Sequence, residues 1–150
     1  MALTILYTFL IAMVPVIELR GAIPFGAGAG LTPALSAVVS AIGNFIPIPF
    51  LLIFVPKLFD WLRDKKLTKK FVAWLENKAK KNHKTIEKYG YIGLIILVAI
   101  PLPGTGAWTG ALVASCFEMD FKKSILAITA GILVAAAIVF AITCGIIQII

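Results

Sequence analysis

The pattern of apolar and polar positions divides the chain into four apolar stretches and one basic segment. Residues 34–55 and 124–147 contain no charged residue, and each exceeds the roughly 20 residues that an α-helix needs to cross the hydrocarbon core of a bilayer. The other two apolar stretches, 1–33 and 89–117, are interrupted near their middle. The pattern therefore predicts two full transmembrane helices and two half-spans.

Each interrupted stretch has a short apolar run followed by residues that break helices. In the second, the ten residues of 91–100 precede Pro101, Pro103, Gly104 and Gly106, and ten residues rise only about 15 Å, half of the core. Backbone that proline and glycine release from a helix is tolerated at this depth only inside protein or along a wet cavity. We expect two re-entrant hairpins; the alternative is an ordinary helix-loop-helix with its loop in water.

The basic residues are distributed so as to favour the hairpins. Residues 57–88 hold eleven Lys or Arg and four acids, which accounts for the whole net charge of +7, and the positive-inside rule places such a segment in the cytoplasm. Lys122 and Lys123 would emerge on the opposite face if 90–116 crossed fully, but on the same face if it enters and returns. We expect a multi-pass protein of the inner or plasma membrane.

The basic segment has the pattern of an amphipathic helix. Its apolar positions Leu67, Phe71, Trp74 and Leu75 follow helical spacing, with bases on the other faces. Such a helix lies at the bilayer surface and faces anionic lipid headgroups. Nucleic acid is not expected as a partner, because spans tether the segment at both ends.

The order of these elements predicts the fold. The first hairpin (1–33), a span (34–56), the amphipathic helix (57–88), the second hairpin (89–117) and a span (122–148) form a single all-α integral membrane domain. The second hairpin and span would be inverted relative to the first, the inverted-repeat plan whose substrate sites lie at the midplane. Since one chain offers little wall around a pathway, we expect a homodimer or higher homo-oligomer.

Composition and motifs argue against a soluble protein and against an enzyme. The chain is 61% hydrophobic and 14% charged, more apolar than a soluble domain can bury. It has no HExxH or GxSxG motif, its single histidine, His83, lies in the basic segment, and Cys116 and Cys144 have no metal-binding neighbours. We expect no cofactor, no metal and no catalytic residue.

Two ionisable residues interrupt the first apolar stretch. Glu18 and Arg20 are the only such residues within the apolar stretches, and charges at depth are costly, so their default interpretation is a substrate, ion or proton site. Residues two apart do not face each other on a helix, although an unwound tip would let them pair. The alternative is a structural pair or a water-exposed loop.

The remaining candidates supply polar groups near the two tips. The second tip offers backbone N–H groups, which attract anions at a helix start, although its glycines would equally serve close packing. Pro47 and Pro49 free the carbonyls of Gly43 and Phe45 and, with Asn44, form either a polar wall facing the tips or a simple kink. The candidate substrate or proton site comprises Glu18, Arg20, Pro24, Asn44, Pro101, Pro103, Gly104, Thr105, Gly106, Trp108 and Thr109.

Three segments carry a family resemblance. ELRGAIPFGAGAG, GNFIPIPF and YGYIGLIILVAIPLPGTGAWTGALVAS resemble the small multi-drug export protein family of bacteria and archaea over about residues 14–140. The resemblance implies a membrane transporter more firmly than it implies drugs as substrates.

More distantly, the chain is similar to the DedA (VTT) superfamily. That group has two re-entrant hairpins and is linked to moving phospholipids or polyprenyl phosphate carriers. Glu18 and Pro24 match its first hairpin, and Pro103, Gly104 and Thr105 match its second. The arginine expected in the second hairpin is absent, which puts a phosphate-lipid substrate in doubt unless Arg20 supplies that charge.

These observations lead to a small transporter as the expected function. In the leading hypothesis it is a proton-coupled carrier in which Glu18 takes and releases the proton and Arg20 holds an anionic group or tunes Glu18. The alternatives are an anionic-lipid scramblase or flippase of DedA type and a non-transporting membrane scaffold or assembly factor. A scaffold would survive mutation of the tips and fail when residues 57–88 are changed.

Overall fold

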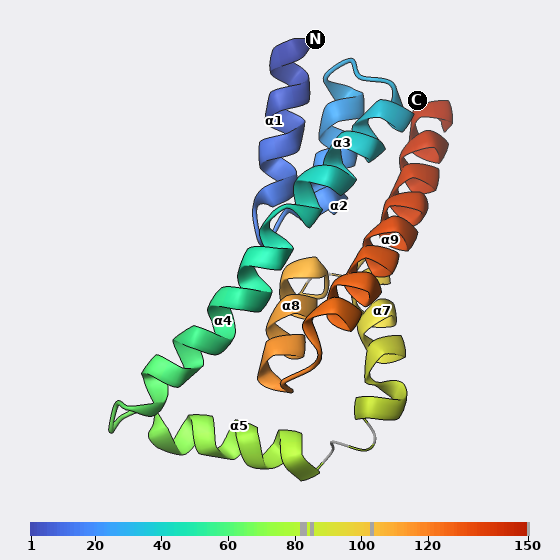
Figure 1. Ribbon diagram of the computed structural model, residues 1–150. Coiled ribbons are helices and arrows are strands. Elements are labelled where there is room, and N and C mark those ends of the chain that lie inside the picture. The colour runs from blue at the N-terminus through green and yellow to red at the C-terminus, as the bar shows by residue number, and fades with distance from the viewer. Residues whose placement is uncertain (82–83, 85, 103, 150) are drawn as a thin grey trace.

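The computed structural model describes residues 1–81, 84, 86–102 and 104–149, and every regular element in this part of the chain is helical (Figure 1). An all-α chain is what the sequence predicted. In chain order the elements are α1 (Ala2–Met13), α2 (Glu18–Gly28), α3 (Pro33–Phe45), α4 (Pro47–Arg63), α5 (Lys69–Lys81), the π-helical turn η1 (Ile86–Gly90), α7 (Tyr91–Ala99), α8 (Ala107–Cys116) and α9 (Phe121–Ile149).

Two helical rods are long and apolar enough to cross a bilayer. Helices α3 and α4 are separated by Ile46 alone and form one span, Pro33–Arg63, of 31 residues, and α9 has 29 residues; an 18-residue window in each has a mean hydropathy of 2.2 and 2.8, respectively. These rods correspond to the two predicted spans. The first continues to Arg63, so residues 57–63 of the basic segment extend the span instead of joining α5.

The two interrupted stretches each fold into a pair of helices. In the first pair, α1 and α2 pack so closely that a Cβ on Gly26 would lie 2.7 Å from the hydroxyl of Thr8. In the second, the N–H of Asp120, just beyond α8, donates to the hydroxyl of Tyr91 at the start of α7 (3.1 Å). Each pair is therefore antiparallel. The pairs enter from opposite ends of the molecule, and their tips lie near mid-height (Figure 1).

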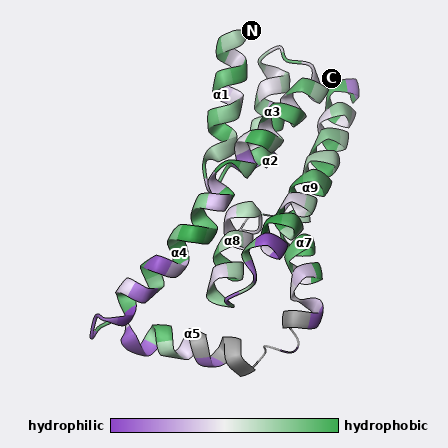
Figure 2. Ribbon diagram, in the orientation of Figure 1, coloured by the Kyte–Doolittle hydropathy of each residue, from purple (hydrophilic) through white to green (hydrophobic). Residues whose placement is uncertain are grey.

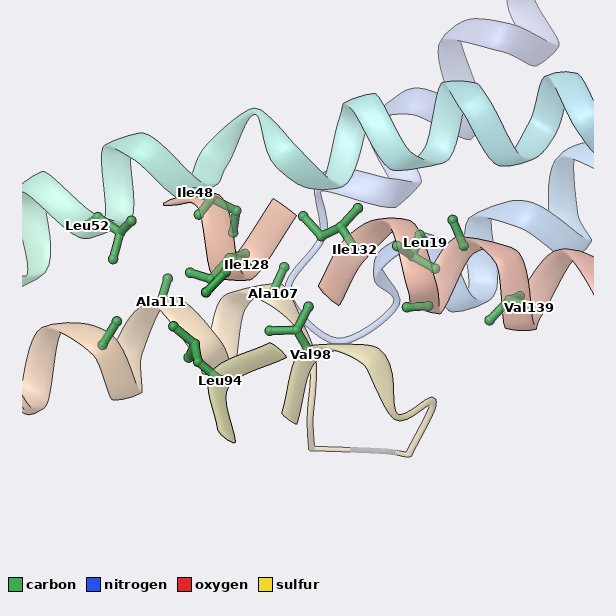
Figure 3. Packing of buried hydrophobic residues seen from close by; sticks show 14 of the residues in the cluster. Leu19, Ile48, Leu52, Leu94, Val98, Ala107, Ala111, Ile128, Ile132 and Val139 are labelled. Carbon is green, nitrogen blue, oxygen red and sulfur yellow. The ribbon is translucent and has the colours of Figure 1, made fainter. Parts of the chain in front are cut away.

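The core lies where the two tips approach α9. Leu19, Val98, Ala107 and Ile132 come from four different helices and are at most 2% exposed (Figure 3). Glycine allows the close approach of α9 to α7, since a Cβ on Gly131 would lie 2.6 Å from the Cβ of Val98. Such small residues permit tight packing between helices in a membrane. The core thereby fixes the position of both tips.

Helix α5 lies across the end of the molecule opposite both termini, where the polar positions of α4 and α5 gather (Figures 1 and 2). Val72 is 2% exposed, whereas Phe71 and Trp74 are 59% and 53% exposed and stack with ring centroids 6.1 Å apart. Helix α5 thus buries Val72 and carries the predicted Phe71 and Trp74 on an exposed face, whereas Leu67 of the predicted stripe precedes the helix and is 97% exposed. The side chain of Leu75 lies outside the described residues.

Candidate functional site

Glu18 begins α2 and reaches across to the second tip. Its backbone has a φ of +50°, a conformation that is uncommon for residues other than glycine, and its side chain is buried at 3% exposure. The backbone N–H of Trp108 donates to the Oε1 atom of this carboxyl group (3.1 Å). The backbone of Ala107 and the side chain of Asn44 also interact with it. Glu18 therefore acts as a cap on the N-terminus of α8, where the helix dipole favours a negative charge.

Gly106 gives the carboxyl group of Glu18 room to approach. Its φ is +134° and its ψ is −171°, in a region that is essentially restricted to glycine. A Cβ at this position would lie 2.1 Å from the Oε2 atom of Glu18. Glycine is therefore required here both by the backbone conformation and by the contact with Glu18.

Arg20, two residues further along α2, binds the other helix end at the second tip. Its guanidinium group donates to the carbonyl oxygens of Leu102 and Thr105 (2.5 Å for Thr105), of Ile100 (2.8 Å) and of Val98 (3.5 Å). It also donates to the Oγ1 atom of Thr105 (3.0 Å). Val98 and Ile100 lie at the C-terminus of α7, where carbonyl groups lack helical partners and the dipole favours a positive charge, and Leu102 and Thr105 lie in the loop between α7 and α8.

We name these contacts the tip clasp: Glu18 and Arg20 of the first tip, with the N-terminus of α8 and the C-terminus of α7 in the second. Each charged side chain binds the helix end of opposite partial charge. Glu18 and Arg20, both described, form no ion pair within 4.0 Å of each other. The pairing that the sequence left open is replaced by a double link between the two hairpins.

Several buried polar atoms around the clasp have no hydrogen-bond partner among the described residues. They are the Oδ1 atom of Asn44, the Nε atom of Arg20 and the indole Nε1 atom of Trp108. The side chain of Asn44 is 1% exposed. Buried polar groups are normally satisfied, and an unsatisfied one calls for an explanation. Two of these three atoms are N–H donors, so a further hydrogen-bond acceptor could bind beside the clasp.

The other predicted site residues contribute differently. Thr109 donates locally to the carbonyl of Gly104 (3.1 Å). A Cβ on Gly104 would meet no atom within 4 Å, although its φ is +83°. Pro24 and Pro101 are exposed. The structure thus brings together Glu18, Arg20, Asn44, Thr105, Gly106 and Trp108, while Pro103 and His83 lie outside the described residues.

The sequence singled out Asn44 but not the two serines that extend its polar stripe along α3. Ser36, Ser40 and Asn44 are each at most 1% exposed, and the hydroxyl of Ser36 donates to the carbonyl of Ile23 in α2 (2.8 Å). Their spacing of four residues puts them on one face of the helix. That spacing in an apolar span was a signal that a polar face meets the first hairpin.

The family described as "Putative small multi-drug export protein" matches residues 18–138, which include every residue of the tip clasp. No curated protein and no solved structure matches the chain.

Proposed function

Because the chain belongs to the small multi-drug export protein family, a family of membrane transporters, we propose that it is a proton-coupled carrier whose transport site lies at the tip clasp. The single observation that carries this proposal is the double link made by Glu18 and Arg20. Ionisable groups at membrane depth mark ion and substrate pathways by default. Here they join two discontinuous helical pairs beside two long apolar rods, an arrangement typical of transporter sites.

In the proposed topology the two helical pairs are re-entrant and the two halves of the chain are inverted in the bilayer. The nine residues of α7 rise about 14 Å, less than half of the hydrocarbon core. A cavity lined by Arg63, Val72, Ser115 and Glu118 puts the end of α8 beside α4 and α5. This proximity supports a cytoplasmic location for Lys122 and Lys123, which follow directly.

Cysteine labelling tests this topology. Single cysteines at Lys69 and Lys123 should react with a membrane-impermeant maleimide only from the cytoplasmic side, and one at Thr32 only from outside, in a Cys116→Ser and Cys144→Ser background. The reason is that a re-entrant second hairpin returns the chain to the side it came from. Labelling of position 123 from outside would exclude the hairpin.

Opening of the site requires the tip clasp to separate. Protonation of Glu18 would remove the negative charge that the N-terminus of α8 favours and so weaken one of the two links. A carrier that opens to each side in turn would then exchange this proton with each side. The substrate that we propose is small or amphiphilic. We propose that it moves out of the cell, because the family description names export.

Glu18→Gln tests the proton coupling. The substitution keeps the shape and one acceptor oxygen but removes the titration, so the protein should fold while proton movement driven by substrate falls to background. The assay uses proteoliposomes that enclose a pH-sensitive dye, with amphiphilic cations and anions added in turn. Glu118→Gln is the matched control, since Glu118 also has a positive φ (+52°) but lies beyond the far end of α8. Undiminished proton movement in Glu18→Gln would place the proton site elsewhere.

An anionic-lipid scramblase is the second candidate, because the second tip reaches the molecular surface. Leu102 is 56% exposed and Ile100 is 40% exposed, so a lipid headgroup would have a lateral route to the clasp. The lysines of α5, together with its exposed aromatic pair, would hold anionic headgroups at the bilayer surface. Movement of labelled phosphatidylglycerol between leaflets without any gradient would favour this candidate over the carrier.

A further inference from the structure

The N-terminus of α8 has the features of an anion site that the protein itself occupies. We propose that the Glu18 carboxylate stands in for an anionic group of the substrate, and that the substrate class is a compact oxyanion, a phosphate or a carboxylate. The anion takes this place when Glu18 is protonated and moves away. The inference rests on the proposed function, since it assigns the substrate class of the same site.

The first line of support is that an anion is already held there. Helix α8 has ten residues, and its first N–H groups, those of Ala107 and Trp108, interact with the carboxyl group of Glu18. Free N–H groups and the helix dipole make such an end suitable for an oxyanion. Gly106 leaves no Cβ in the path of the approaching oxygen atoms.

The second line of support is the set of polar groups that Glu18 leaves unsatisfied. The Nε atom of Arg20 and the Nε1 atom of Trp108 are buried N–H donors without a partner among the described residues. Asn44, 1% exposed, directs its side chain to the carboxyl group of Glu18 and has its Oδ1 atom unpartnered. An oxyanion with three or four oxygen atoms, or a protonated one, would provide more acceptors and donors than one carboxyl group.

Competition between Glu18 and the anion would by itself couple transport to protons. Among the described residues, Arg20 is the charged group that acts on Glu18; α3 contributes only the amide of Asn44, and α8 contributes backbone groups. In the empty site, the ionised Glu18 provides one negative charge at the N-terminus of α8. In the loaded site, Glu18 is neutral and a bound monovalent anion provides the same single negative charge. Each monovalent anion would therefore cross together with one proton, without net charge movement.

Binding to Glu18→Gln provides the test. With Trp61→Phe and Trp74→Phe, the indole of Trp108 is the only tryptophan and reports on the site. Inorganic phosphate, titrated into the protein in neutral detergent, should bind Glu18→Gln at least about tenfold more tightly than the parent, because the competing charge is gone. Short-chain phosphatidic acid is the second probe. A gain for both probes supports the site for free and lipid phosphate, and a gain for the lipid probe alone identifies the lipid as the source.

The controls separate this inference from the proposed function. Glu118→Gln has the same charge change and should bind phosphate as the parent does. If Glu18→Gln does not fold, the parent itself should bind sulfate, whose charge is constant, at least about tenfold more tightly at pH 5 than at pH 8. No gain with either probe in folded Glu18→Gln, or no such pH effect in the parent, would overturn the inference. Loss of proton movement without a gain in binding would leave the carrier standing and remove only the anion site.

Discussion

Arg20→Ala is expected to lower the free energy of unfolding by about 3 kcal/mol and to abolish transport. Hydrogen bonds from a charged donor to neutral acceptors contribute about 1.5–3 kcal/mol each but are not additive. Arg20 donates to the carbonyl group of Ile100, at the C-terminus of α7, and to that of Thr105, in the loop before α8. Removing it takes away the hydrogen bond to the carbonyl of Thr105, leaves the carbonyl of Ile100 with only the hydroxyl of Thr105 and the N–H of Leu102 as donors, and leaves Glu18 without its cationic neighbour. These effects destabilise the second tip.

Arg20→Lys is the comparison that identifies the cause. Lysine keeps the charge but loses the planar fork that reaches several carbonyl groups at once, so we expect an intermediate stability and partial activity. Unfolding by a denaturing detergent, followed by circular dichroism, measures the first, and proton movement in proteoliposomes measures the second. If Arg20→Ala were as stable and as active as the parent, the clasp would have no part in either property.

The long helices and the break in the second apolar stretch could be predicted because they depend on local properties of the chain, whereas the first break lies at residues 14–17, before the Glu18–Gly28 segment that the sequence placed in an unwound tip and that forms α2. The length of an uncharged run decides whether a helix can cross the bilayer, and the close-set prolines and glycines of 101–106 end α7, whereas the single Pro24 and Pro56 lie inside helices. The sequence therefore indicated both rods and both interrupted stretches. It placed the start of the amphipathic helix at Lys57, where the basic residues begin. This boundary was wrong because a change in charge does not end a helix, and α4 continues to Arg63.

The partners of the charged residues could not be predicted, because they come from distant parts of the chain. The sequence singled out Glu18, Arg20 and the amide groups of the second tip, but it treated the amide groups and Arg20 as open to an anion. In the structure Glu18 takes the N-terminus of α8 and Arg20 takes the C-terminus of α7. Which helix end a side chain meets depends on how two hairpins pack, and spacing within one hairpin contains no information on that.

The two glycines of the second tip illustrate the same limit. Gly104 and Gly106 are equivalent in the sequence pattern, and both have a positive φ. Only Gly106 faces the carboxyl group of Glu18, whereas a Cβ on Gly104 would point into open space. The distinction depends on Glu18 of the first tip, 86 to 88 residues away along the chain. Substitutions at the two glycines can therefore separate the effect of backbone strain from the effect of the contact with Glu18.

Gly106→Ala is expected to lower the free energy of unfolding by about 3 kcal/mol, of which about 1 kcal/mol is backbone strain and the rest is loss of the contact between Glu18 and α8. The strain arises from the φ of +134°, and the loss arises because the new Cβ would lie 2.1 Å from the carboxylate.

Gly104→Ala separates these two contributions, since it introduces strain at a φ of +83° without any clash and should lower the free energy of unfolding by only about 1 kcal/mol. Combining Gly106→Ala with Glu18→Ala completes the cycle: once the carboxyl group is gone, the added methyl group should lower the stability no more than it does at Gly104. Denaturing-detergent titrations of the single and double variants measure each step. Equal losses for Gly104→Ala and Gly106→Ala would mean that the approach of Glu18 to Gly106 contributes nothing to stability, and the clasp would then depend on Arg20 alone.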